Sequence, residues 1–171
     1  MGAGPFLVPR EESDPMTDLP PLPEGFTLYE EYDRDYAHTL RTLQLAVPAG
    51  HIFPPHAPVT EVRPGETAIY EKGCGEVRAM FAWLTAVECA ALTAHAAGDD
   101  EAAHGWLLVA AQWPETETFK RWNEPDVPVS WYDGVLAPAL SGDFSYMAEE
   151  AMGAITDLPE PSGTNGKDQH G

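Results

Sequence analysis

Two histidines and a glutamate in a proline-rich stretch are the first residues that could do chemistry. They are His51, His56 and Glu61, and Gly50 and Gly65 flank them. Two imidazoles and a carboxylate can supply the three protein ligands of a catalytic metal site. A metal-dependent enzyme that uses this loop is therefore one hypothesis. Histidines in proline-rich loops usually bind no metal, so we predict neither a metal nor another cofactor.

A cysteine at the start of a long apolar segment is the second candidate. Cys74 would sit at a helix N-terminus, where the helix dipole can lower a thiol pKa and make the thiol nucleophilic. Catalysis would also require a base, for which His51 and His56 are the candidates. A buried structural cysteine is the simpler interpretation. With Cys89 as the other cysteine, a disulfide scaffold is excluded, and no catalytic residue is assigned.

The five tryptophans all lie between residues 83 and 131. Core packing is the favoured interpretation, because tryptophan buries a large apolar area. The alternative is a partner-binding patch formed by Trp113, Trp122 and Trp131, since tryptophan is enriched at interaction hot spots. Prolines interrupt this part of the chain, so its side chains should project irregularly.

The chain carries a net charge of −19, and several of its acids are two residues apart. On an extended backbone this spacing places carboxylates about 6 to 7 Å apart, close to the interval between phosphates along a DNA strand. On a helix the same side chains diverge. A nucleic-acid mimic that blocks a DNA-binding protein is thus a second hypothesis. An acidic surface repels nucleic acids and anionic membranes, so direct binding to either is not expected. The acids concerned include Glu115 and Glu117, Glu124 and Asp126, and Glu31, Asp33 and Asp35.

The elements that must position these residues are organised around a helical hairpin over 75–113. Gly98 can close the first helix in the left-handed conformation, and Asp99 or Asp100 can cap the second. Pro114 should break or restart the second helix. Apolar residues recur on the first helix at intervals of three and four, which places them on one face. Those residues include Val77, Met80, Phe81, Leu84, Val87 and Ala91. Trp83, Ala86 and Ala90 broaden that face, so this helix should be buried on most sides.

Before the hairpin, a helix is predicted from Gly25 to Leu40, opening with Thr27 and Glu30 at the spacing of a capping box. Residues 40–71 remain open between helix and strand. In this stretch the pattern allows a small β-hairpin or an irregular insert, with strands at 59–62 and 67–71 and a turn at 63–66.

After the hairpin, three further helices are expected. They cover 115–122, then 131–140 with a distortion at Pro138, and then 143–155 with Asp143 as its cap. The last should dock on the hairpin through its apolar stripe. That stripe consists of Phe144, Met147, Ala148, Ala151, Met152 and Ile155.

The sequence therefore predicts a mainly α fold, with α+β possible, as a single domain over 26–157. Residues 1–25 and 158–171 are expected to be disordered tails, and a start at Met16 instead of Met1 should leave the fold intact.

No transmembrane or export segment is evident, so a cytosolic protein is expected. Motifs for phosphate, dinucleotide or nucleophile-elbow chemistry are absent. The favoured function is non-catalytic: an adaptor, assembly factor or inhibitor that binds another protein, with basic and DNA-binding proteins as the candidate partners. The proposed contact residues are Trp113, Trp122, Trp131, Glu115 and Glu117.

Overall fold

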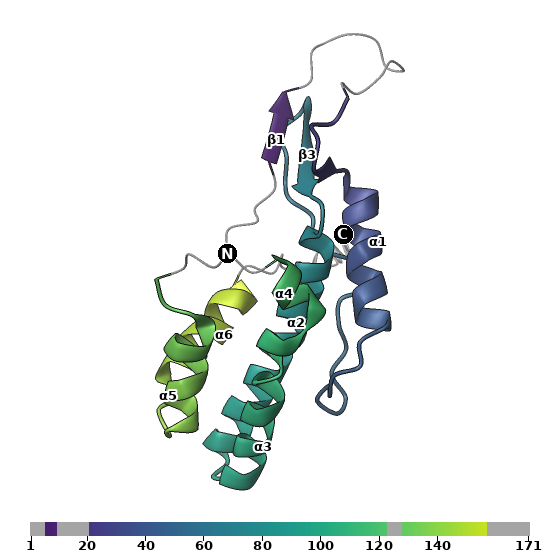
Figure 1. Cartoon of the computed structure of the whole chain (residues 1–171). Helices are drawn as coiled ribbons and strands as arrows, with labels where there is room; N and C mark the ends of the chain where they lie inside the picture. Colours follow the sequence, from purple (N-terminus) through teal and green to yellow (C-terminus); the bar gives the residue numbers. More distant parts are fainter. Residues whose placement is uncertain (1–5, 10–20, 123–127, 157–171) are drawn as a thin grey trace, which may run out of the picture.

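A computed structural model describes residues 6–9, 21–122 and 128–156. The fold is mainly α, with a small antiparallel sheet at one end (Figure 1). The helices are α1 (Tyr29–Arg41), α2 (Cys74–Ala96), α3 (Asp100–Ala110), α4 (Glu117–Trp122), α5 (Ala137–Leu140) and α6 (Ser145–Thr156). Two further helical segments differ from the α-helix: a tighter 3-10 helix at Trp113–Glu115 and a wider π-helix at Tyr132–Leu136. The strands are β1 (Phe6–Pro9), β2 (Phe26–Thr27) and β3 (Glu66–Glu71).

The predicted helical hairpin is confirmed as α2 and α3. Gly98 has φ +73°, a left-handed conformation that a residue with a Cβ adopts only at a cost. The Asp99 carboxylate then accepts a hydrogen bond of 3.0 Å from the Ala102 amide and caps α3. Both signals are local in the sequence, so the turn was predictable without knowledge of the tertiary structure.

Helix α2 is the central element and contacts α1, α3, α4 and α6. By length and composition it could span a membrane, yet half of its most apolar stretch is buried inside this protein. Figure 1 shows α1 on one side of α2 and the α5–α6 pair on the other. The apolar character of α2 is therefore explained by its neighbours, which cover it on several sides.

Two separate apolar clusters hold these elements together. The larger lies between the hairpin and the segment 131–156, and it includes Trp83, Val87, Trp113, Leu136 and Met147. The smaller joins α1, β3 and the first turns of α2, and it includes Tyr32, Tyr36, Tyr70, Cys74 and Ala79. Because they have different members, one cluster can loosen while the other stays packed.

Helices α1 and α2 approach each other closely at Gly75. A Cβ on this residue would lie 2.9 Å from the Tyr36 amide nitrogen and closer still to the Tyr32 carbonyl oxygen. Only glycine allows the two backbones to cross at this distance. Helix α1 itself begins later than predicted, and its first residue, Tyr29, follows Leu28, which has no side chain cap. The predicted capping box at Thr27 and Glu30 is therefore wrong, since Thr27 belongs to β2.

The stretch 40–71, left open between helix and strand, begins with the last two residues of α1 and ends with β3. Between them the chain is irregular from Leu43 to Gly65, which is the irregular insert that the sequence allowed. The expected turn at 63–66 is present, with Gly65 at φ +87° and a bond of 3.0 Å from the Glu66 amide to the Arg63 carbonyl. The strand expected at 59–62 is absent. Val59 and Val62 are 64% and 40% exposed, so this segment has no buried face to fix its register.

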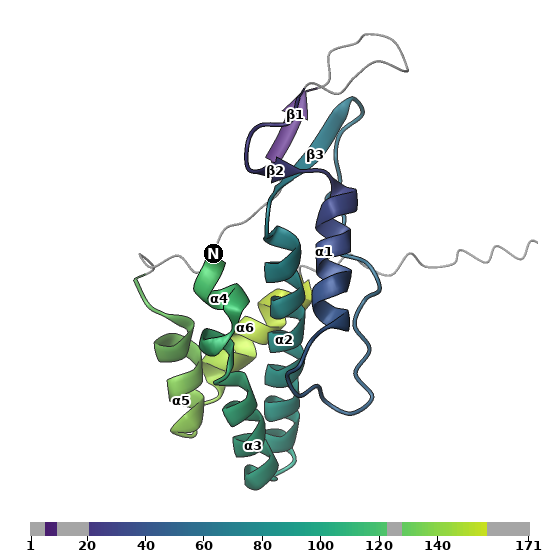
Figure 2. The same cartoon turned by 45° about the vertical axis from the view of Figure 1, so that its right-hand side comes forward.

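The partners of β3 are instead two distant strands (Figure 2). In the antiparallel register, Phe6 lies opposite Ile69 and Phe26 opposite Glu71. Within the predicted tail over 1–25, residues 6–9 form β1, so a chain beginning at Met16 would lack this strand. The remainder of the predicted tails, 10–20 and 158–171, lies outside the described residues, as do residues 1–5.

The segment after α3 follows the predicted order of helices. Pro114 lies in the 3-10 helix, and Thr116 caps α4 by accepting a bond of 3.1 Å from the Phe119 amide. The distortion predicted near Pro138 takes the form of the π-helix, in which the Ala137 amide bonds to the Tyr132 carbonyl five residues back. Proline has no amide hydrogen to offer a regular α-helical ladder, which is consistent with a wider turn just before it.

Helix α6 docks on the hairpin as predicted. Met147 and Ala151 are buried in or beside the larger cluster, and Asp143 accepts a bond of 3.1 Å from the Ser145 amide. One member of the predicted stripe was misplaced, because Met152 is 65% exposed. The buried face of α6 is narrower than the pattern of apolar residues suggests.

Candidate functional site

The three tryptophans of the predicted binding patch have three different environments. Trp113 is 1% exposed and lies within the larger cluster, with its ring edge-on to Phe119 at 5.1 Å and tilted against Phe81 at 5.9 Å. Its predicted role as a contact residue is therefore wrong, because a partner cannot reach it in this fold. Trp83 is also fully buried. For these two residues the favoured interpretation, core packing, is confirmed.

Trp122 and Trp131 lie far apart. The indole of Trp122 donates to Glu76 at 3.2 Å, and the indole of Trp131 donates to Glu88 at 2.9 Å. Glu76 and Glu88 are twelve residues apart on α2, which corresponds to about 18 Å along a helix. A single patch of Trp113, Trp122 and Trp131 therefore does not exist, and Trp122 is the one most accessible to a partner, at 37% exposure.

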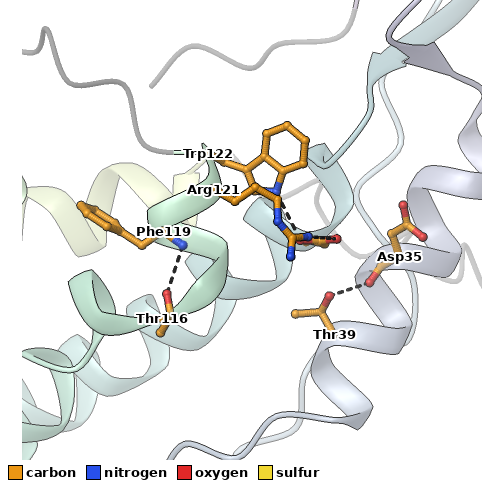
Figure 3. Close-up of polar contacts among 7 residues, drawn as sticks. Asp35, Thr39, Thr116, Phe119, Arg121 and Trp122 are labelled. Atoms are coloured by element: carbon orange, nitrogen blue, oxygen red, sulfur yellow. Dashed lines mark hydrogen bonds and ion pairs between the residues drawn. The ribbon is translucent and has the colours of Figure 1, made fainter.

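Trp122 belongs to a small set of polar contacts that fastens the end of α4 to the first turn of α2 (Figure 3). The Glu76 carboxylate accepts from the Trp122 indole and also from the Arg121 guanidinium, at 3.4 Å. We call Glu76, Arg121 and Trp122 the α4 clasp. Figure 3 also shows Asp35, which belongs to the neighbouring helix α1.

Gly73 explains how an indole ring can lie so close to the start of α2. This glycine has φ +90°, and a Cβ added to it would be 2.8 Å from one Trp122 ring carbon and closer to others. The ring therefore lies against backbone where any other residue would place a side chain. The position of Trp122 is fixed by this contact on one face and by Glu76 at its edge.

Replacing Gly73 with alanine should displace the Trp122 ring. The left-handed backbone alone would cost about 1 to 2 kcal/mol of folding free energy, and the new methyl group would occupy the space of the ring. We expect the indole N–H resonance of Trp122 in an NMR spectrum to move to the position of a free indole. An unchanged resonance in a folded Gly73→Ala variant would contradict this packing.

Carboxylates crowd the α1 side of the clasp. The pKa of Asp35 is raised above its ordinary value, first by burial and then by the negative charges of Glu31 and Glu76, while Arg34 partly opposes these effects. Burial is the largest of these causes, and the two charges show that Glu31 and Glu76 lie close enough to Asp35 for the three carboxylates to interact.

The other two predicted contact residues, Glu115 and Glu117, are exposed at the opposite end of α4. Glu115 forms an ion pair with Lys120 at 3.6 Å. The extended spacing that a nucleic-acid mimic needs is not realised, since Glu115 ends a 3-10 helix and Glu117 begins α4. The related acids at 31, 33 and 35 all lie on α1, and the pair at 124 and 126 lies outside the described residues.

The metal-site candidates are not gathered. The Nδ1 atom of His56 bonds to the Asp33 carboxylate at 2.9 Å, and the same carboxylate accepts from the Ala57 amide at 2.7 Å. His51 packs edge-on against Phe53. Within residues 6–9, 21–122 and 128–156, no group of three histidine, cysteine or acidic side chains could hold a metal ion. Asp33 and His56 instead fasten the irregular loop to α1, and Tyr29 adds a bond of 2.8 Å to the Ala57 carbonyl.

Cys74 does begin α2, as predicted, but its thiol is not activated. Burial raises the pKa of Cys74, and the nearby negative charge of Glu71 adds to the rise. These effects outweigh the helix dipole and favour the neutral thiol, which is a poor nucleophile. Cys74 is a buried packing residue of the smaller cluster, and the hypothesis of an activated nucleophile is wrong.

Glu88 is not among the predicted site residues, although its carboxyl group is buried within an apolar part of the fold. Its side chain is 1% exposed in the middle of α2. Burial raises the pKa of Glu88 to about 8, the Trp131 indole opposes that rise, and the charge of Glu150 adds to it. A signal was present in the sequence, because Glu88 is the only charged residue between Arg78 and His95 on the predicted buried helix.

Comparison of the chain with protein-family models, with curated proteins and with solved structures finds no significant match.

Proposed function

We propose that this protein is a non-catalytic, cytosolic binding protein that recognises a basic segment of another protein through Trp122. The observation that carries the proposal is the α4 clasp. It presents a partly exposed indole in a fixed orientation next to Glu76, whose charge also acts on Asp35 of α1. Such a surface offers a face for a cation–π contact and negative charge for an arginine or lysine side chain.

Two further features support a binding role. The net charge of −19 would speed association with a basic partner and disfavour nucleic acids and anionic membranes. In addition, the indole is already immobilised by Gly73 and Glu76, so little side-chain entropy would be lost when a partner binds. Preorganised tryptophans of this kind are typical of interaction hot spots.

The test is affinity capture from the host's cells with the full chain and with Trp122→Ala as baits, followed by a binding titration with the purified partner. Loss of a hot-spot tryptophan should weaken the complex by about 2 kcal/mol or more, which is about thirtyfold in Kd. Tyr146→Ala is the matched control, because Tyr146 is another exposed aromatic residue, on α6. It should leave the affinity unchanged.

Salt dependence and metal content separate this proposal from the alternatives. A partner whose binding is insensitive to Trp122→Ala would contradict the proposal. If that partner is a DNA-binding protein and dissociates at high salt, the nucleic-acid mimic is favoured instead. Stoichiometric metal in the purified protein, lost on His56→Ala, would favour the metal-dependent enzyme.

A further inference from the structure

Glu88 lies at the junction between α2 and the segment 131–156. The indole of Trp131 approaches it from the start of that segment, and Glu150 approaches it from α6. The larger apolar cluster surrounds this junction, with Val87 of α2 fully buried next to Glu88 and with Leu136 and Met147 contributed by the docked segment. A carboxyl group therefore occupies an otherwise apolar interface between two parts of the fold.

The π-helix helps to bring Trp131 to this position. Its hydrogen bonds join residues five apart, so Trp131 and Leu136 lie on the same side of the segment. Leu136 is fully buried in the cluster, while the Trp131 indole reaches Glu88. Widened turns of this type frequently occur where a side chain has a functional role.

No positive charge compensates for Glu88 among the groups that shift its pKa. On α2 its titratable neighbour is Cys89, whose own pKa is raised by burial and by Glu88. From α6 comes another acid, Glu150, and from the π-helical segment comes the neutral indole; Asp133 there is exposed and bonded to Ser130. The core face of α3 consists of Ala103, Leu107 and Ala110, which carry no charge.

We propose that Glu88 is a protonation-controlled latch, which holds the segment 131–156 on α2 while its carboxyl is neutral and releases it when the carboxyl ionises. A buried carboxylate with one neutral hydrogen-bond donor and an acidic neighbour is costly, whereas release would return it to water. The smaller cluster of α1, β3 and the start of α2 shares no member with this interface, so it stays packed on release.

The direction of the pH response follows from the two protonation states. The docked form has a pKa of about 8 for Glu88, against 4.5 for the ordinary side chain, so docking favours the protonated acid. Raising the pH from about 4.5 to about 8 therefore favours release, by up to about tenfold per pH unit for one proton. Above about 8 both forms are ionised and the response levels off.

The test is amide hydrogen exchange of the full chain and of Glu88→Gln, measured side by side from pH 5 to pH 9 (about one unit apart). Glutamine keeps the shape and still accepts a bond from Trp131, but it does not ionise. At each pH we divide the exchange rate of an amide in the unmodified chain by the rate of the same amide in Glu88→Gln, which cancels the intrinsic pH dependence of exchange. We expect this ratio to rise about tenfold per pH unit between about pH 6 and 8 for α6 amides and to stay constant for α1 amides.

Two results would overturn the latch. A ratio for α6 that does not change with pH would show that ionisation of Glu88 does not control docking. An equal rise in α1 and α6 would show that Glu88 affects global stability alone. Glu150→Gln provides an independent test that leaves Glu88 in place: near pH 8 it should slow α6 exchange relative to the unmodified chain, and near pH 5 it should not. No difference at either pH would also count against the latch.

Discussion

Trp113→Ala is expected to destabilise the protein by about 3 to 5 kcal/mol, the range typical of deleting a large buried aromatic side chain. The indole is 1% exposed and fills the space between Phe81 and Phe119, so its removal leaves a cavity in the larger cluster. The measurement is urea denaturation followed by the far-ultraviolet circular dichroism of the helices.

Trp122→Ala is the matched comparison, with the same change of residue type at the surface. Its ring is 37% exposed, and its hydrogen bond to Glu76 is accessible to water, so a loss of about 1 kcal/mol or less is expected. Equal losses in the two variants would contradict the assignment of Trp113 to the core and Trp122 to the surface. A small loss at Trp122 also makes that variant suitable for the binding experiment, since its fold is retained.

The contrast between these two tryptophans shows where the sequence was insufficient. Both residues flank the same short stretch near Pro114, and residue type alone favours either core packing or binding. The outcome depends on what packs against each ring. Phe81 of α2 reaches Trp113, and Gly73 leaves room for Trp122, but neither contact is visible as a spacing in the sequence.

Local signals predicted local structure well. Gly98 and Asp99 marked the turn of the hairpin, Asp143 marked the start of α6, and Pro138 marked a distorted helix. Each of these depends on the backbone preference or hydrogen bonding of one residue, which its neighbours hardly alter.

Pairing over long distances was not predictable in the same way. The alternation at 59–62 suggested a strand beside 67–71, but β3 pairs with β1 and β2, which come from the region assigned to a tail. A strand gains most of its stability from its partners and from a buried face, and neither is encoded within the strand itself. For the same reason, nothing in the sequence indicated that His56 bonds to the Asp33 carboxylate of α1.

Gly75→Ala should disrupt the packing of α1 against α2. The added Cβ would meet the backbone of α1 at Tyr32 and Tyr36, and backbone cannot move aside as a flexible side chain can. The two helices would have to separate, which loosens the smaller cluster. We expect a loss of about 2 to 3 kcal/mol in the free energy of unfolding, measured by urea denaturation.

Gly105→Ala on α3 is the control that isolates this steric effect. Gly105 also lies within a helix, but a Cβ there would meet nothing within 4 Å. Alanine has the higher helix propensity, so this variant should gain up to about 1 kcal/mol. The same substitution is thus expected to have opposite signs at the two positions. If Gly75→Ala also stabilised the protein, α1 and α2 would not cross as closely as the structure indicates, and the smaller cluster would need a different arrangement.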